Sequence, residues 1–180
     1  MQAQNYNTQS DYRGSEETPL MIPFAPGCVP MRGGLDSSTA AVLSRAGLLR
    51  TFCSAWDLVT TEIVYEEIGR GPDAPLISAI LNEYCTIERV SGQGLFGRGE
   101  NSVLTLYTRG QTKIVFSDDG PFLKYCRKKN IPYYSSIMVP FLMCRLQVLP
   151  RDDALRYTAI ITDKGRFSNW VIEYVREIWE

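Results

Sequence analysis

The sequence contains no histidine, and this absence narrows the catalytic chemistry available to the chain. Histidine-based triads, histidine zinc sites and imidazole general bases are all excluded. Five cysteines are scattered along the chain and never form a Cys-x-x-Cys pair, so neither a disulfide framework nor a thiolate zinc site is predicted. If the protein catalyses hydrolysis, carboxylates and a hard cation are the remaining plausible means.

Long hydrophobic runs and a marked net charge are also missing. No segment approaches the ~20 apolar residues of a membrane span, and the apolar segment Ile137–Val148 predicts a core helix instead. The N-terminus lacks a basic and then apolar signal, so we expect a cytoplasmic protein without a membrane partner. With a net charge of −1 and a pI near 5.6, any binding of nucleic acid would depend on local basic residues.

The 180 residues and 44% apolar content predict one globular domain. Residues 1–24 are rich in Gln, Asn, Ser and Thr and predict a disordered tail, which leaves 25–180 as the domain. Strand-like and helix-like segments alternate along it, beginning with a poor strand within Cys28–Leu35. This alternation predicts a three-layer α/β/α fold with a central parallel sheet of about five strands and extra C-terminal helices.

The segment Thr112–Phe122, with the sequence TKIVFSDDGPF, is the centre of the functional prediction. Its apolar, β-branched part predicts a buried strand, which ends at Ser117, Asp118 and Asp119. Ligands of open α/β sheets bind beyond the carboxyl ends of the strands, so both aspartates are candidates for chemistry. An ordinary structural role competes with this one, because Asp119 before Gly-Pro is also a good helix N-cap.

Asp36 is the second candidate, because it ends the first predicted strand. Ser37 or Ser38 is expected to cap the helix that follows.

Two glutamates occupy inward positions on predicted helices. In the helix Glu62–Ile68, the apolar spacing turns Glu67 inward and Glu66 outward. Glu100 heads a stripe that continues at Val103, Leu104 and Tyr107. Each glutamate also has an ordinary alternative role, as a hydrogen-bonded side chain or as an acid in a first helical turn.

Together these acids predict a metal-dependent site. Crowded carboxylates raise one another's pKa, so a shared pocket requires protons or a divalent cation, and Mg²⁺ or Mn²⁺ accepts such oxygen ligands. The candidate catalytic residues are Asp36, Glu67, Glu100 and Asp119. The candidate metal ligands are Asp36, Glu100, Asp118 and Asp119.

The order and spacing of these motifs resemble the PIN-domain nucleases. Asp36-Ser37-Ser38 is similar to the Asp-x-Ser/Thr motif of that family, and Val64–Ile68 is similar to its V-x-x-E-[IL] helix. Gly99-Glu100 is similar to the Gly-Glu helix start, and Ser117–Phe122 is similar to the Ser/Thr-x-Asp-x-x-Phe strand end. The doubled Asp118-Asp119 resembles a bacterial and archaeal subgroup with two aspartates in this fourth motif.

The resemblance implies a Mg²⁺- or Mn²⁺-dependent endoribonuclease that hydrolyses RNA by a metal-activated water. Ser38 and Ser117 would orient carboxylates or waters, Arg98 and Lys124 would contact the RNA backbone, and single-stranded RNA would be preferred. The resemblance does not decide the biological role, which could be that of a toxin with an antitoxin-type protein partner or that of a processing enzyme. The apolar final helix is compatible with packing on the domain or with a homodimer.

Two alternatives remain beside this one. The segment RGGLDSST also resembles the SGGxDS[ST] phosphate loop of the ATP pyrophosphatases, in which glycine amides bind pyrophosphate. Here Arg32 stands where that loop begins with serine. The other alternative is a non-catalytic interaction module that keeps the fold and uses its acids as caps and hydrogen-bond acceptors.

Overall fold

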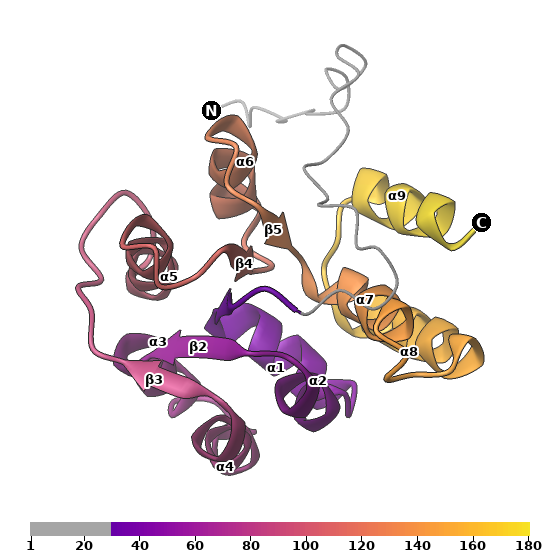
Figure 1. The fold of residues 1–180 in the computed structure, drawn as a ribbon, viewed down its shortest axis with the longest axis horizontal. Helices are drawn as coiled ribbons and strands as arrows, with labels where there is room; N and C mark the ends of the chain where they lie inside the picture. The colour runs from indigo at the N-terminus through magenta and orange to yellow at the C-terminus, as the bar shows by residue number, and fades with distance from the viewer. Residues whose placement is uncertain (1–29) are drawn as a thin grey trace, which may run out of the picture.

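The computed structural model describes residues 30–180, which form an α/β fold with one parallel sheet (Figure 1). The predicted tail of residues 1–24 lies outside the described residues. The five strands of the sheet are β1 (Gly33–Leu35), β2 (Leu58–Thr61), β3 (Thr86–Glu88), β4 (Ile114–Phe116) and β5 (Tyr133–Tyr134). Their spatial order is β3-β2-β1-β4-β5, and every pairing is parallel. The predicted three-layer architecture with about five parallel strands is thereby confirmed.

Nine α-helices and one short 3₁₀ helix, η1, surround this sheet within the described residues. They are α1 (Ser37–Arg45), α2 (Leu49–Ala55), α3 (Glu62–Ile68), α4 (Ala74–Tyr84), α5 (Arg98–Thr108), α6 (Gly120–Lys128), η1 (Ser136–Met138), α7 (Val139–Arg145), α8 (Arg151–Lys164) and α9 (Asn169–Trp179). In Figure 1, α5 and α6 lie on one side of the sheet, and α1, α2, α4, α7 and α8 lie on the other. Helix α3 contacts α1 and α4 on that second side and α5 on the first.

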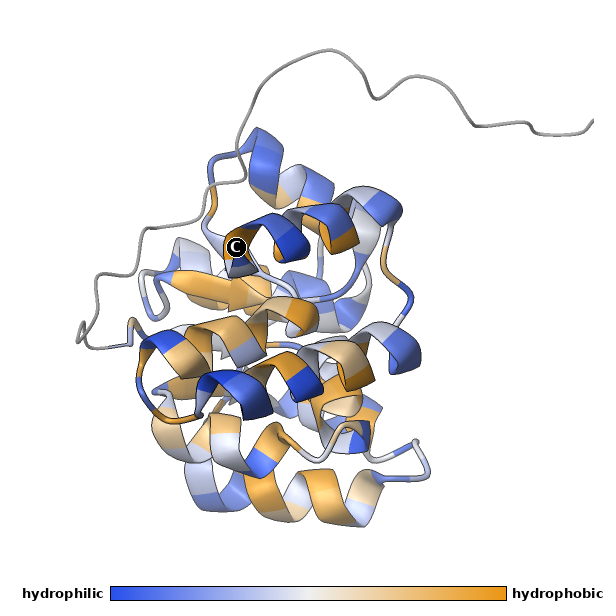
Figure 2. Ribbon diagram, turned by 90° about the vertical axis from the view of Figure 1, so that its right-hand side faces the viewer, coloured by the Kyte–Doolittle hydropathy of each residue, from blue (hydrophilic) through white to orange (hydrophobic). Residues whose placement is uncertain are grey.

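The core consists of the strands and the inner faces of these helices. Figure 2 shows the strands as apolar and many helices as apolar on one side only. Phe116 of β4 is fully buried and makes edge-on contacts with Phe52 and Trp56, at centroid distances of 5.0 and 5.2 Å. Within residues 30–180, no helix combines the length and the apolar character needed to cross a membrane.

Two predicted elements differ from the structure. The first strand covers only Gly33–Leu35, while residues 28 and 29 of the predicted segment lie outside the described part of the chain. The helix predicted over Ile137–Val148 is divided into η1 and α7 and ends at Arg145, since Gln147 adopts a positive φ of 60°.

The final helix packs on the domain itself. Val175 and Trp179 of α9 are buried, and the Trp179 ring lies edge-on to Phe141 of α7 at 5.2 Å. The apolar final helix was expected to pack either on the domain or on a second copy of the chain, and its contacts with α7 show the first of these.

Gly33 is required by the close packing of β1 against β4. A Cβ atom at this position would lie 2.6 Å from Cε2 of Phe116. We expect Gly33→Ala to destabilise the protein by about 1–3 kcal/mol, the usual range for overpacking a core, as measured by urea unfolding. Gly120→Ala is the matched control, because a Cβ there meets nothing within 4 Å. Equal unfolding midpoints for the two variants would contradict this account.

Candidate active site

The candidate site begins where the central strands end. Leu35 of β1 is in register with Phe116 of β4, so the next residues, Asp36 and Ser117, lie side by side. The backbone N–H of Asp36 donates to the Phe116 carbonyl at 3.1 Å, which extends the pairing to this point. Because all five strands are parallel, Asp36, the Ser117–Asp119 segment and Ser136 share one edge of the sheet.

Asp36 is buried and fully hydrogen-bonded. One carboxylate oxygen accepts from the Thr39 N–H and the Ser38 hydroxyl, both at 2.9 Å. The other accepts from Ser38 at 2.9 Å and from the Ser117 hydroxyl. The pKa of Asp36 is raised to about 7, mainly by burial and to a lesser extent by the charge of Asp118, and its hydrogen bonds oppose the shift.

Asp36 also caps α1, so the expectation that Ser37 or Ser38 would cap this helix is wrong. The backbone of Asp36 is extended, and its side chain accepts the Thr39 N–H. The hydrogen bond to β4 holds Asp36 between the end of β1 and the start of α1. Both serines therefore lie inside the first turn of α1. Their hydroxyls are free to bind carboxylates instead: Ser38 binds Asp36, and Ser37 binds Glu67.

The doubled aspartates point to different neighbours. Asp118 accepts from the Ser136 N–H at 2.8 Å through one oxygen, while its other oxygen is buried and has no hydrogen-bond partner among the described residues. Burial raises the pKa of Asp118, and hydrogen bonding by Ser136 lowers it in part. Asp119 caps α6 by accepting the Phe122 N–H at 2.8 Å, as the ordinary structural role of this residue predicted.

The two glutamates approach this edge from the helices. Glu67 is half-buried and Glu66 is exposed, so the predicted orientation of α3 is confirmed. Glu67 accepts from the Ser37 hydroxyl and from the Gly99 N–H, each at 3.0 Å, and this ties α3 to both α1 and α5. Burial raises the pKa of Glu100, and the nearby charges of Asp119 and Glu67 raise it further.

The structure therefore brings the predicted acids together as two neighbouring groups. The charge of Asp118 raises the pKa of Asp36, and the charges of Asp119 and Glu67 raise the pKa of Glu100. Among the described residues, no three or more acidic or cysteine side chains are arranged so that they could hold a metal ion. By donor type the set fits Mg²⁺ or Mn²⁺, since every ligand is an oxygen and one Asp118 oxygen is buried without a hydrogen-bond donor.

The predicted RNA-contacting cations lie on the surface. The side chain of Arg98 is 65% exposed at the start of α5, 4.0 Å from Glu66, and Lys124 is exposed on α6. Sequence reasoning missed the contacts of Ser37 and Ser136. The signal for Ser136 was its position two residues after β5, at the edge where the acids were expected.

Gly33 and Gly34 do not form a loop. They belong to β1, where they pair with Leu58 and Val59 on one side and with Ile114 and Val115 on the other. The Gly33 N–H donates to the Asp57 carbonyl at 2.9 Å. Glycines placed inside a buried strand do not suit the phosphate-loop interpretation of RGGLDSST.

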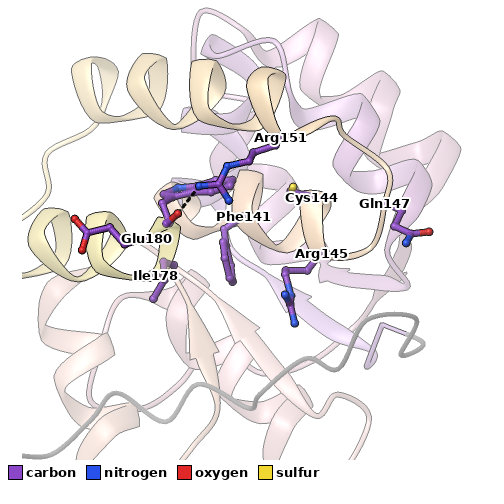
Figure 3. A pocket seen from close by; sticks show the side chains of 8 residues that line it. Phe141, Cys144, Arg145, Gln147, Arg151, Ile178 and Glu180 are labelled. Carbon is purple, nitrogen blue, oxygen red and sulfur yellow. Dashed lines mark hydrogen bonds between the residues drawn. The ribbon is translucent and has the colours of Figure 1, made fainter.

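Two surface pockets lie by the C-terminal helices. One has a volume of about 460 Å³, with Phe141, Arg145 and Arg151 in its wall (Figure 3). In it, Arg151 donates to the backbone oxygen of Trp179 at 2.5 Å. The other, of about 790 Å³, is lined by residues of α8 and α9. Within residues 30–180, none of the predicted acids lines either pocket.

Comparisons with family models and with curated proteins found no relative of this chain. The functional proposal therefore rests on the residues and their geometry.

Proposed function

We propose that the protein is a divalent-metal-dependent endoribonuclease that acts on single-stranded RNA. The observation that carries the proposal is that five carboxyl groups from four segments lie in two neighbouring groups, at or beside the carboxyl ends of β1 and β4. Three of them, Asp36, Glu100 and Asp118, have a pKa that burial raises. The charge of Asp118 adds to the shift of Asp36, and the charges of Asp119 and Glu67 add to that of Glu100. Groups that repel in this way are common at functional sites, because a bound cation or a proton relieves the repulsion.

The acids have different tasks in this proposal. Asp36, Asp118 and Asp119 would hold Mg²⁺ or Mn²⁺, while Glu100, also a candidate ligand, is reserved for proton transfer. Ser38 and Ser117 keep the Asp36 carboxylate in place through their hydroxyls. The Ser37 hydroxyl and the Gly99 N–H hold the Glu67 carboxylate in the same way. When bound, the cation would supply positive charge that stabilises the phosphate and favours ionisation of a water.

Glu100 is the residue to which we assign proton transfer. It is half-buried, and its raised pKa makes it a better base near neutral pH than an ordinary glutamate. In the hydrolysis, the water oxygen would form a bond to phosphorus while its proton passes to this carboxylate. The bond from phosphorus to the leaving oxygen breaks, and that oxygen takes up a proton from solvent water. Arg98 and Lys124 would contact the phosphate backbone on either side.

A non-catalytic interaction module is the second candidate, and the hydrogen bonding of Asp36 favours it. Both oxygens of this carboxylate already accept hydrogen bonds, and Asp36 and Asp119 cap helices. In such a module the acids would serve the fold alone. An antitoxin-type protein partner or a second copy of the chain would then bind elsewhere on the surface.

The test is cleavage of a fluorescently labelled single-stranded RNA by the purified protein. We expect cleavage with Mn²⁺ or Mg²⁺, its loss in EDTA and its recovery when Mn²⁺ is added in excess. Duplex RNA and single-stranded DNA of the same sequence should be cleaved more slowly. Absence of cleavage with either metal would reject the proposal in favour of the interaction module. Cleavage that persists in EDTA would reject the role of the metal.

A further inference from the structure

Leu95 is the most exposed of the large apolar side chains in the described part of the chain. It lies in the segment that links β3 to α5, and 85% of its surface is accessible to solvent. A single apolar residue on a surface is common and needs no explanation by itself. Leu95 stands out because of the segment that carries it. The backbone of this segment is held firmly.

Asn101 and Phe96 fix the segment next to Leu95. The side chain of Asn101, only 4% exposed, accepts the Phe96 N–H at 3.2 Å and donates to the Phe96 carbonyl at 2.6 Å. The Phe96 ring lies edge-on to Phe122 and Tyr125 of α6, at 5.2 and 5.1 Å. Leu95 therefore projects into solvent from a backbone that is fixed on its C-terminal side.

The segment borders the carboxylates. Gly97 packs so closely against the side chain of Glu100 that a Cβ at this position would clash with the carboxylate. Leu95 precedes Gly97 by two residues, so their Cα atoms are at most about 7 Å apart. Arg98, which is largely exposed, follows directly.

We propose that Leu95 is a substrate-positioning residue that packs against a nucleobase next to the scissile phosphate of single-stranded RNA. This inference rests on the proposed ribonuclease function. An unpaired base presents a flat apolar face that a leucine side chain can cover, and Arg98 lies where it can contact the adjoining phosphate.

A nucleobase fits this place better than a protein partner does. A specific protein interface buries more than about 1,000 Å² and is built around a cluster of apolar or aromatic anchors. The neighbours of Leu95 that are exposed with it are Gln93, Gly94, Gly97 and Arg98, which offer no second apolar or aromatic anchor. A single flat ring, in contrast, can be covered by one side chain.

The experiment compares Leu95→Ser with Leu76→Ser, a matched control on α4 whose leucine is 55% exposed. With a single-stranded RNA in Mn²⁺, we expect Leu95→Ser to raise KM about fivefold with kcat nearly unchanged, as partial burial of one leucine suggests. The KM and kcat of Leu76→Ser should equal those of the wild type. A series of RNAs with one abasic position near the mapped cleavage site then locates the base, because removal of the contacted base should cost the wild type about fivefold and Leu95→Ser nothing more.

Each result has a defined meaning. Two results would overturn the contact with a base. One is that Leu95→Ser and the missing base reduce cleavage additively at every abasic position. The other is an unchanged KM for Leu95→Ser, as expected if Leu95 serves a protein partner. A wild-type protein that cleaves no RNA rejects the ribonuclease proposal itself. The role of Leu95 is then decided by fluorescence anisotropy with the same labelled RNA in EDTA. Weaker binding by Leu95→Ser than by Leu76→Ser supports the contact, and equal binding overturns it.

Discussion

Glu100→Gln is expected to lower kcat for Mn²⁺-dependent RNA cleavage by about a hundredfold or more, the contribution of one group in acid-base catalysis. The substitution keeps the size of the side chain and removes its charge and its ability to accept a proton. Glu100 caps no helix and is only half-buried, so the fold should not change. Initial rates at saturating RNA, together with thermal unfolding of the same preparation, check both expectations.

Glu173→Gln is the matched control for this variant. It removes a carboxylate of the same type from an exposed position on α9, away from the sheet edge. Its activity should equal that of the wild type. If Glu100→Gln retained activity within threefold of the wild type while folding normally, Glu100 would have no catalytic role.

The second large effect concerns the pH dependence of stability. The pKa of Asp36 is about 7 in the folded protein and has its ordinary value of 3.8 in the unfolded chain, so the folded state binds the proton more tightly. This contribution to stability is fully present below pH 4 and is lost as the pH rises towards 7. The loss is on the order of 4 kcal/mol, at about 1.4 kcal/mol for each pKa unit.

Urea unfolding in EDTA at several pH values tests this expectation. The free energy of unfolding should fall between pH 4 and 7 in the wild type and fall less steeply in Asp36→Asn. Asp118 and Glu100 also have raised pKa values, so some dependence should persist in the variant. Mn²⁺ at pH 7 should stabilise the wild type more than Asp36→Asn. Identical pH profiles for the two proteins would show that Asp36 is not the group responsible.

Periodicity was enough to predict the fold and the orientation of α3. The apolar positions of Glu62–Ile68 place Glu67 inward and Glu66 outward wherever the helix packs, because the helical repeat alone determines which face is buried. The alternation of strands and helices similarly predicts a parallel sheet, since parallel strands require crossover connections.

Contacts between distant segments were beyond such patterns. Aspartate and serine are comparable N-caps. Asp36 caps α1 because the pairing of β1 with β4 extends to this residue, and the local sequence does not show where that pairing ends. The clamp of Asn101 on Phe96 depends on the path of a segment that the sequence presented only as glycine-rich. The spacing of the acids suggested that they converge. It could not show that they form two groups, because this depends on how distant segments pack together.

The order of the strands has a consequence for how the two groups would respond to a ligand. Asp36 and Asp118 follow β1 and β4, which each have a hydrogen-bonded strand on both sides, whereas Glu67 and Glu100 are carried by helices. Local opening is costlier in the middle of a sheet than in peripheral elements. We therefore expect Asp36 and Asp118 to act as the stationary half of the site, and α3 and the start of α5 to supply the adjustment when an ion or a substrate brings the two halves closer.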